Sequence, residues 1–270
     1  MDLTISIVNY NTKEFLHDCL NSIYCSNIKT KFQVCVVDNN STDGSSEMVE
    51  SCFRDVQLTT NCRNEGFGVA HNQIIKNTFT KYILVLNPDI TILPKSINKM
   101  VLFLEKNSAI GALGCKLLNI DGSLQYSCRK FPDPLTILLR GLDIGLWFSD
   151  SKMFRNYMMP DWDHSSIAAV DWITGSCMML RRDALNDIGL FDERFFMYFE
   201  DVDLCLRMYK NWKVCYFPNS QMIHHHLQQS QKLTSIRQKL IHFKSAYYFF
   251  NKHGLYFNGP VIHRCANKYA

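Results

Sequence analysis

Residues 32–45 read FQVCVVDNNSTDGS, and this stretch decides the fold class. Its first six residues are a continuous apolar run rich in β-branched side chains, as expected for a strand buried on both faces. A polar loop that opens with Asp38 follows at once. Strands of this kind occur in parallel sheets covered by helices on both sides, so the stretch predicts an α/β fold.

The flanking sequence continues the alternation of strand and helix patterns. Apolar runs predict strands at 5–8, 32–37, 56–59, 82–86, 170–180, 213–217 and 221–224, with a hairpin over 110–129. Helical periodicity predicts helices at 15–23, 46–53, 69–79, 94–106, 182–188, 200–211 and 233–251, with an amphipathic piece at 135–148. The β-α order of the first hundred residues predicts a doubly wound, mostly parallel sheet.

Charge is distributed unevenly along the 270 residues. The net charge is +4, yet residues 1–203 hold all 25 acidic and 19 of the 29 basic residues, a charge of −6. Residues 204–270 carry ten basic residues and no acidic one, a charge of +10. A basic segment behind an acidic body predicts an anionic partner. No RNA- or DNA-binding motif accompanies it, so we expect no nucleic-acid partner.

The sequence shows no export or membrane-spanning pattern. The N-terminus, MDLTISIVNY, lacks the basic region of a signal peptide. No apolar run reaches the roughly 18–20 residues of a spanning helix. The eleven cysteines are scattered without a CxxC pair, which argues against a zinc ribbon or a redox motif. We therefore expect a reducing cytoplasm as the setting.

Polar clusters follow three of the expected strands, where open parallel sheets bind ligands. Asp38 is a candidate for recognition of a nucleotide base and ribose, and an Asx-type turn is an equally good interpretation. The cluster at 64–68 precedes a helix whose N-terminus is suited to phosphate, or it is a plain loop. Asp89, with Asn87 beside it, follows strand 82–86. One carboxylate can hold Mg²⁺ against a diphosphate, and a turn that caps the next helix is the alternative interpretation of Asp89.

The acidic cluster Glu200, Asp201 and Asp203 lies at the expected start of a helix. Acids at this position commonly complement the helix dipole. Three acids within four residues also repel one another, and the bulky apolar flanks raise a carboxyl pKa, which suits a general base. The triplet 224–226, three histidines, ends a strand and is either a solvated end or a metal or phosphate ligand.

Six ordered stretches together resemble the family 2 glycosyltransferases of the GT-A fold, most closely the bacterial rhamnosyltransferases that build O-antigen and related cell-wall polysaccharides. They are VVDNNSTDGS, NEGFGVAHN, LNPDI, DWITGSCMMLRRDAL, GLFDERFFMYFEDVDLCLR and YFPNSQMIHHH. The resemblance spans about residues 3–250. It predicts a catalytic domain over 1–230 and a basic amphipathic helical extension over 231–270 that packs on the same domain.

The resemblance also implies roles for particular residues. Asp201 is the expected catalytic base with Glu200 as its neighbour, and Trp172 and Gly175 line the sugar sites. A divalent metal, Mg²⁺ or Mn²⁺, is expected on Asp89 and His224. The strict acidic metal triplet of the family is broken at Asn87. The expected nucleotide-sugar residues are Asn9, Asp38, Asn40, Asn64, Gly66, Asn87 and Asp89.

The implied function is inverting transfer of L-rhamnose from dTDP-L-rhamnose to a glycan on polyprenyl diphosphate, during synthesis of O-antigen or another cell-surface polysaccharide. The expected place is the cytoplasmic face of the bacterial plasma membrane, with peripheral contact through segments 135–148 and 233–251. A family 2 transferase with another donor is one alternative. A non-catalytic glycan- or membrane-binding protein is another, but such a protein is expected to lack Asp89 or Asp201. A sugar nucleotidyltransferase is disfavoured, because residues 9–12 lack a glycine-rich basic loop.

Overall fold

The computed structural model describes residues 1–141, 152–225 and 236–255. Its strands are β1 (Leu3–Asn9), β2 (Phe32–Asp38), β3 (Gln57–Thr60), β4 (Tyr82–Leu86), β5 (Ile90–Ile92), β6 (Ile110–Leu118), β7 (Leu124–Gln125), β8 (Cys128–Arg129), β9 (Ala168–Ala169), β10 (Trp172–Ile173), β11 (Cys177–Arg181) and β12 (Lys213–His224). Its helices are α1 (Lys13–Cys25), α2 (Ser45–Cys52), α3 (Phe67–Lys76), α4 (Ser96–Lys106), α5 (Pro134–Gly141), α6 (Lys152–Met158), α7 (Arg182–Ile188), α8 (Glu200–Met208) and α9 (Ile236–His253).

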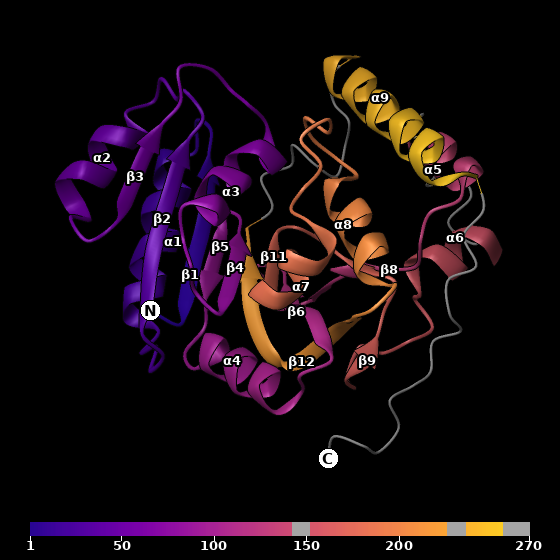
Figure 1. Cartoon of the computed structure of the whole chain (residues 1–270), viewed down its shortest axis with the longest axis horizontal. Coiled ribbons are helices and arrows are strands. Elements are labelled where there is room, and N and C mark those ends of the chain that lie inside the picture. The colour runs from indigo at the N-terminus through magenta and orange to yellow at the C-terminus, as the bar shows by residue number, and fades with distance from the viewer. Residues whose placement is uncertain (142–151, 226–235, 256–270) are drawn as a thin grey trace.

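Most of these strands form one twisted sheet with the order β3-β2-β1-β4-β11-β6-β12-β5 (Figure 1). The first four are parallel, and β11 runs antiparallel between β4 and β6. Strand β12 is parallel to β6, and β5 pairs antiparallel with β12 at the edge. Strands β8 and β10 form a separate small sheet. The predicted α/β fold with a mostly parallel sheet is therefore confirmed.

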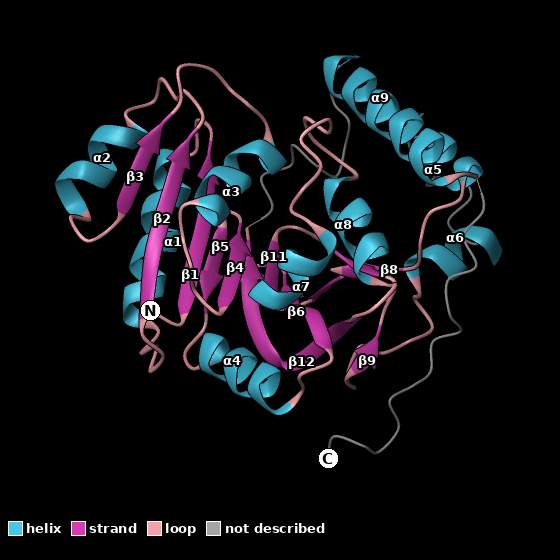
Figure 2. Cartoon of the chain, in the orientation of Figure 1, coloured by secondary structure: helices cyan, strands magenta, loops and turns pink. Residues whose placement is uncertain are grey.

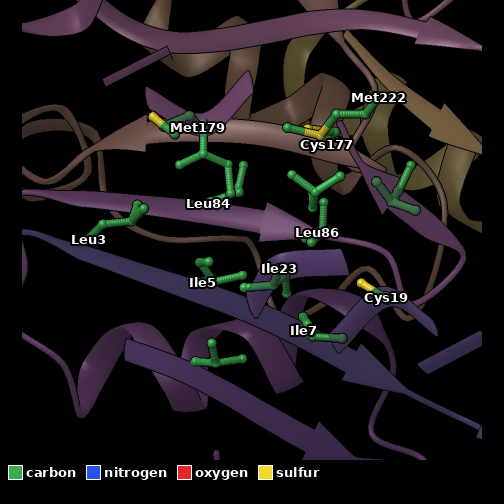
Figure 3. Packing of buried hydrophobic residues seen from close by; sticks show 14 of the residues in the cluster. Leu3, Ile5, Ile7, Cys19, Ile23, Leu84, Leu86, Cys177, Met179 and Met222 are labelled. Carbon is green, nitrogen blue, oxygen red and sulfur yellow. The ribbon is translucent and has the colours of Figure 1, made fainter. Parts of the chain in front are cut away.

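Helices cover both faces of the sheet (Figure 2). Alternate side chains of β4 point to opposite faces, as the period of a strand requires. Tyr82, Leu84 and Leu86 join one apolar cluster with α1, α2 and α4, while Ile83 and Val85 join the other with α3, α7 and α8. Figure 3 shows the first cluster, in which the sulfur-containing side chains of Cys19, Cys177, Met179 and Met222 complete the packing between strands and helices.

Several expected elements differ from the structure. The strand expected at 170–180 is divided into β10 and β11, because the chain turns at 174–176, where the Thr174 N–H bonds to the Ser127 carbonyl and the Gly175 N–H to Asp201. The two strands expected at 213–224 are one strand, β12, whose register shifts at Pro218, a residue that strands tolerate only at edges and bulges. The expected hairpin extends only to β7, since β8 pairs with β10.

Some predictions concern residues outside those that the structure describes. They include the domain boundary at residue 230, the part of segment 135–148 beyond Gly141, and the first residues of the helix expected at 233–251. Among the described helices, none has both the length and the apolar character needed to cross a bilayer. The ten cysteines that the structure describes are all free thiols.

Candidate active site

Asn9 and Asp38 lie side by side at the carboxyl ends of β1 and β2, where the parallel register pairs them directly. The Asn9 amide donates to Asp38 Oδ1 at 2.7 Å, and the Ser41 N–H donates to Asp38 Oδ2 at 2.8 Å. The Thr12 hydroxyl donates to Asn9 Oδ1 at 2.6 Å. Both side chains are buried, so this network fixes the Asp38 carboxylate in one orientation. Asn40 is exposed and has a left-handed backbone, with φ of 65°.

Asn39 is a site residue that the sequence analysis did not single out. Its amide donates to the Gly66 carbonyl at 3.2 Å, and its side-chain oxygen accepts a bond from the Asn61 amide at 2.8 Å. It therefore ties the loop after β2 to the loop before α3. Its position directly behind the strand-end Asp38 was the available sequence signal, since strand-end polar residues meet at one sheet edge.

The loop before α3 packs closely against the segment before α8. Asn64 Oδ1 accepts the Gly66 N–H at 2.9 Å, and Gly66 itself has φ of 86° and ψ of −178°. A Cβ at this position would lie 2.2 Å from the Phe196 carbonyl oxygen, which accepts the Phe67 N–H at 3.0 Å. One N–H at the start of α3 is therefore bonded to protein. The two loops meet through backbone atoms.

Asp89 and His224 are brought together from distant parts of the sequence. The side chains are buried, with His224 Nε2 at 3.3 Å from Asp89 Oδ1. His224 Nδ1 lies 2.5 Å from Gln125 Oε1, an oxygen that can only accept, so Nδ1 carries the proton. His224 Nε2 then faces the Asp89 carboxylate. Two acceptors at this separation repel unless a proton or a cation lies between them.

This arrangement fits a divalent metal with few protein ligands. A hydrogen-bond acceptor on the far nitrogen of a ligating histidine is the usual way to orient its ring, and Gln125, which the sequence analysis missed, has this role. Within the described residues no three His, Cys, Asp or Glu side chains form a metal cluster. Mg²⁺ binds proteins through one or two carboxylates together with phosphate oxygens. The Asp89–His224 pair is therefore suited to a metal that a diphosphate completes. Asn87 lies half-buried nearby, its N–H bonded to the Ser176 carbonyl.

Asp201 is held at the start of α8 by two backbone donors. The Gly175 N–H donates to Oδ2 at 3.0 Å and the Val202 N–H to Oδ1 at 2.8 Å. Burial raises the pKa of Asp201, while these two N–H groups and the charge of Arg129 oppose that rise without cancelling it. The preceding residues, Tyr198 and Phe199, have φ of 70° and 69°. Consecutive left-handed residues store strain of the kind that concentrates at functional sites.

Glu200 is buried directly beside Asp201. Burial, and next the charge of Asp201, raise the pKa of Glu200 well above that of an ordinary carboxyl. Its Oε2 atom is buried and has no hydrogen-bond partner among the described residues. A carboxyl in such surroundings is held in its neutral form over a wider pH range than in water.

Glu200→Gln is expected to stabilise the protein at pH 8. Because folding raises the pKa of Glu200, the folded state retains a proton that the unfolded state releases, and stability falls as pH rises from the unfolded toward the folded pKa. The substitution removes this loss, and each 1 kcal/mol gained raises Tm by about 2–4 °C. Thermal unfolding at pH 4.5 and pH 8 measures it, with exposed Glu105→Gln as control. An equal Tm for Glu200→Gln and the parent at pH 8 would contradict the assignment.

Trp172 lies in β10, and Gly175, in the turn that follows it, bonds to Asp201. The Trp172 side chain is buried, and its Nε1–H donates to the Lys130 carbonyl at 2.8 Å while the Arg129 guanidinium lies 5.3 Å from the ring centroid. Its polar atom is thus bonded within the protein. A Cβ at Gly175 would lie 2.9 Å from Phe67 Cζ, so the missing side chain lets Phe67 of α3 pack against the turn beside Asp201.

Asp203 is the centre of an ion-pair network. It lies 2.8 Å from Arg207 Nε, 2.5 Å from Lys252 Nζ and 2.7 Å from His253 Nε2. Burial raises its pKa, but the His253 bond and the neighbouring cations outweigh burial, so its pKa is lowered. Asp203 is therefore paired with cations, and is not simply one of three mutually repelling acids, as its spacing from Glu200 and Asp201 had suggested. The i,i+4 spacing to Arg207 was the signal of its pairing.

Comparisons with known proteins identify the family of this chain. The model of glycosyl transferase family 2 matches residues 4–189. The chain is a family 2 glycosyltransferase. It is 30% identical over 244 residues to the N-acetylglucosaminyl-diphospho-decaprenol L-rhamnosyltransferase of Mycobacterium tuberculosis, covering 84% of this chain and 78% of the relative. It is 29% identical over 170 residues to the rhamnosyltransferase WbbL of Escherichia coli, covering 59% of this chain and 61% of WbbL.

Solved structures show the fold of this family 2 glycosyltransferase. A mannosyltransferase from Pyrobaculum calidifontis, solved with GDP-Man and Mn²⁺, superposes with a TM-score of 0.60 at 18% identity. The match covers 91% of this chain and 64% of the mannosyltransferase, so this chain spans less than two thirds of that protein and of WbbL. The fold is GT-A. The predicted family and fold are therefore both confirmed.

Proposed function

We propose that this glycosyltransferase moves L-rhamnose from dTDP-L-rhamnose to a glycan on polyprenyl diphosphate, with inversion at the anomeric carbon, in the synthesis of O-antigen or another cell-surface polysaccharide. The choice of sugar and acceptor is supported by the relative from Mycobacterium tuberculosis, whose name specifies both an L-rhamnosyl group and a diphospho-decaprenol acceptor. At 30% identity over 84% of the chain, this likeness favours a related substrate pair.

The placement of Asp201 carries the proposal. Two N–H groups fix its carboxylate, and burial raises its pKa, which brings the group closer to the working pH of a general base. In the proposed step Asp201 takes the proton from an acceptor hydroxyl as the oxygen attacks the anomeric carbon. The sugar passes through an oxocarbenium-like state, and attack opposite the leaving diphosphate inverts the configuration. Glu200 is the buried neighbour of this proposed base.

The nucleotide end of the donor is proposed to lie along the carboxyl ends of β1, β2 and β4. There Asp38, whose carboxylate is held by the Asn9 amide, is proposed to bind the nucleotide base and the ribose. The polar residues around it complete the proposed donor site: Asn40, Asn64, Gly66 and Asn87. A divalent cation on Asp89 and His224 would neutralise the charge that develops on the leaving diphosphate.

An apolar and basic face of α5 and α9 is proposed to contact the inner face of the bacterial plasma membrane. The two helices lie side by side in Figure 1. The large apolar side chains exposed on them are Leu135, Leu138, Ile236, Leu240 and Tyr247. Arg237 and Lys244 are exposed on α9, and no acidic residue occurs after Asp203. Each basic residue near an anionic surface contributes about 1 kcal/mol.

A transfer assay tests the function. The purified protein is incubated with labelled dTDP-L-rhamnose, UDP-GlcNAc or GDP-mannose and with GlcNAc-diphospho-polyprenol in vesicles of neutral or anionic lipid. We expect transfer from dTDP-L-rhamnose alone, a product of opposite anomeric configuration, and a higher rate on anionic vesicles. EDTA is expected to abolish transfer, and Mn²⁺ or Mg²⁺ to restore it.

Each contrary result removes a defined part of the proposal. Transfer from another nucleotide sugar would replace the donor. Retention of configuration would exclude Asp201 as a base in a single displacement. Binding to anionic vesicles without transfer from any donor would favour a non-catalytic binding protein built on the same fold.

A further inference from the structure

The C-terminal helix α9 packs against the segment that leads into α8. The ring of Phe249, which is fully buried, lies 5.4 Å from that of Phe199, and the rings of Tyr248 and Phe195 are 4.9 Å apart. The Ser245 hydroxyl donates to the Met197 carbonyl at 2.8 Å. One face of α9 thus covers residues 195–199, immediately before Glu200 and Asp201.

Lys252, in the last turn of α9, joins a residue before this segment, Asp192, to a residue after it, Asp203. Its ammonium lies 2.7 Å from Asp192 Oδ2 and 2.5 Å from Asp203 Oδ1. The side chains of Asp192 and Asp203 are 10% and 0% exposed, and that of Lys252 is 21% exposed. A charge pair removed from water to this degree costs far more to break than a surface pair. One side chain therefore closes the stretch 192–203 into a loop.

The segment inside this loop needs outside support. Tyr198 and Phe199 both have left-handed backbones, which cost a non-glycine residue about 1–2 kcal/mol each. Such conformations persist only where the surrounding structure determines them. The contacts of α9 and the two ion pairs of Lys252 provide that support.

We propose that Lys252 is a positioning residue for the base: by joining Asp192 to Asp203 it holds the loop that places Asp201, and its charge offsets that of Asp203 behind the base. The proposal rests on the proposed role of Asp201. The Lys252 ammonium contacts the stretch 192–203 through these two carboxylates and lies 6.0 Å from the centroid of the Phe195 ring. It is separated from Asp203 by about fifty residues of sequence, so no local pattern reveals the link.

The electrostatic part of this role has its own signature. The groups that face the Glu200–Asp201 pair are Arg129 from β8, Tyr198 from the segment, and Asp203 and Cys205 from α8. The charge of Asp203 already raises the pKa of Glu200. Without Lys252 this charge is less neutralised, so ionising either carboxyl costs more. The acid limb of the rate profile then moves to higher pH, a change that loosened packing alone does not produce.

The experiment compares Lys252→Met and Lys252→Arg with the parent in the transfer assay. Lys106→Met, an exposed lysine on α4, is the matched control. We expect Lys252→Met to lower kcat about 10-fold, with donor KM within about 2-fold and the acid limb at higher pH, because small misplacements of a catalytic group have large effects on rate. Lys252→Arg is expected to retain most of the parental kcat and to have the acid limb of its pH–rate profile at the parental pH. Hydrogen exchange of residues 195–203, measured on the same proteins, is expected to quicken in Lys252→Met alone.

Two results would overturn the proposal. One is a Lys252→Met protein with parental kcat, pH profile and exchange. The other is a loss of kcat in both Lys252 variants without any shift of the acid limb, which indicates a purely structural part for the lysine. If the parent itself transfers no sugar, the proposed function fails, and the exchange measurement still decides whether Lys252 holds the loop.

Discussion

Asp201→Asn is expected to lower kcat by about 10²–10⁴, the range for loss of a general base, with donor KM nearly unchanged. Asparagine has the shape of aspartate, and its side-chain oxygen can still accept a bond from the Gly175 or Val202 N–H. It cannot take a proton from the acceptor hydroxyl. Steady-state kinetics with varied donor and saturating acceptor separates the two constants.

Asp183→Asn is the matched control, since this exposed aspartate also lies in the first turn of a helix, α7. It should leave both constants unchanged. The parent should lose activity as pH falls, with the midpoint above about 3.9, the value of an unperturbed aspartate, because the pKa of Asp201 is raised and its ionised form is the active one. Near-normal turnover of Asp201→Asn would remove Asp201 from the mechanism.

Gly66→Ala is expected to destabilise the protein by about 2–5 kcal/mol, the sum of backbone strain and overpacking. The φ and ψ angles of Gly66 belong to a region that is essentially restricted to glycine. The added Cβ also lies 2.2 Å from the Phe196 carbonyl oxygen, a backbone atom that cannot rotate away. Urea unfolding of the purified variant measures the change.

Gly122→Ala separates the two causes. Gly122 also has positive φ, 80°, but nothing lies within 4 Å of its added Cβ. This control should therefore cost only the left-handed strain, about 1–2 kcal/mol. Equal losses at both positions would show that the approach to Phe196 contributes nothing to stability.

The parallel half of the sheet was predictable because each of its strands has a recognisable local sequence pattern. The runs at 5–8, 32–37 and 82–86 are continuous and apolar, and they correspond to β1, β2 and β4. The second half depends on long-range partners that no local pattern contains. Strand β12 continues through Pro218 because it pairs with β6 on both sides of the shift. The run at 170–180 is interrupted at 174–176, where the Thr174 N–H bonds to the distant Ser127 carbonyl and the Gly175 N–H to Asp201.

The candidate site shows the same division. Family resemblance predicted Asn9 and Asp38 for one site and Asp89 with His224 for another, and the structure brings each pair together. Residues that only orient or pair with a site residue were not predicted from the sequence. Gln125 is recognisable only once the orientation of the His224 ring is known. The partners of Asp203 on α9 come from about fifty residues away, beyond the reach of spacing rules.

The backbone junction between Gly66 and Phe196 limits how substrate preference can be redesigned. The loop over 61–66 belongs to the donor half of the proposed site, and the segment over 191–199 to the acceptor half. The Gly66 backbone lies so close to the Phe196 carbonyl that only glycine fits there, and the Phe67 N–H donates to that carbonyl. A graft of either loop alone that shifts its backbone, or that replaces Gly66, is expected to break this junction. Chimeric enzymes should therefore exchange both loops as one unit, so that donor and acceptor halves are inherited together.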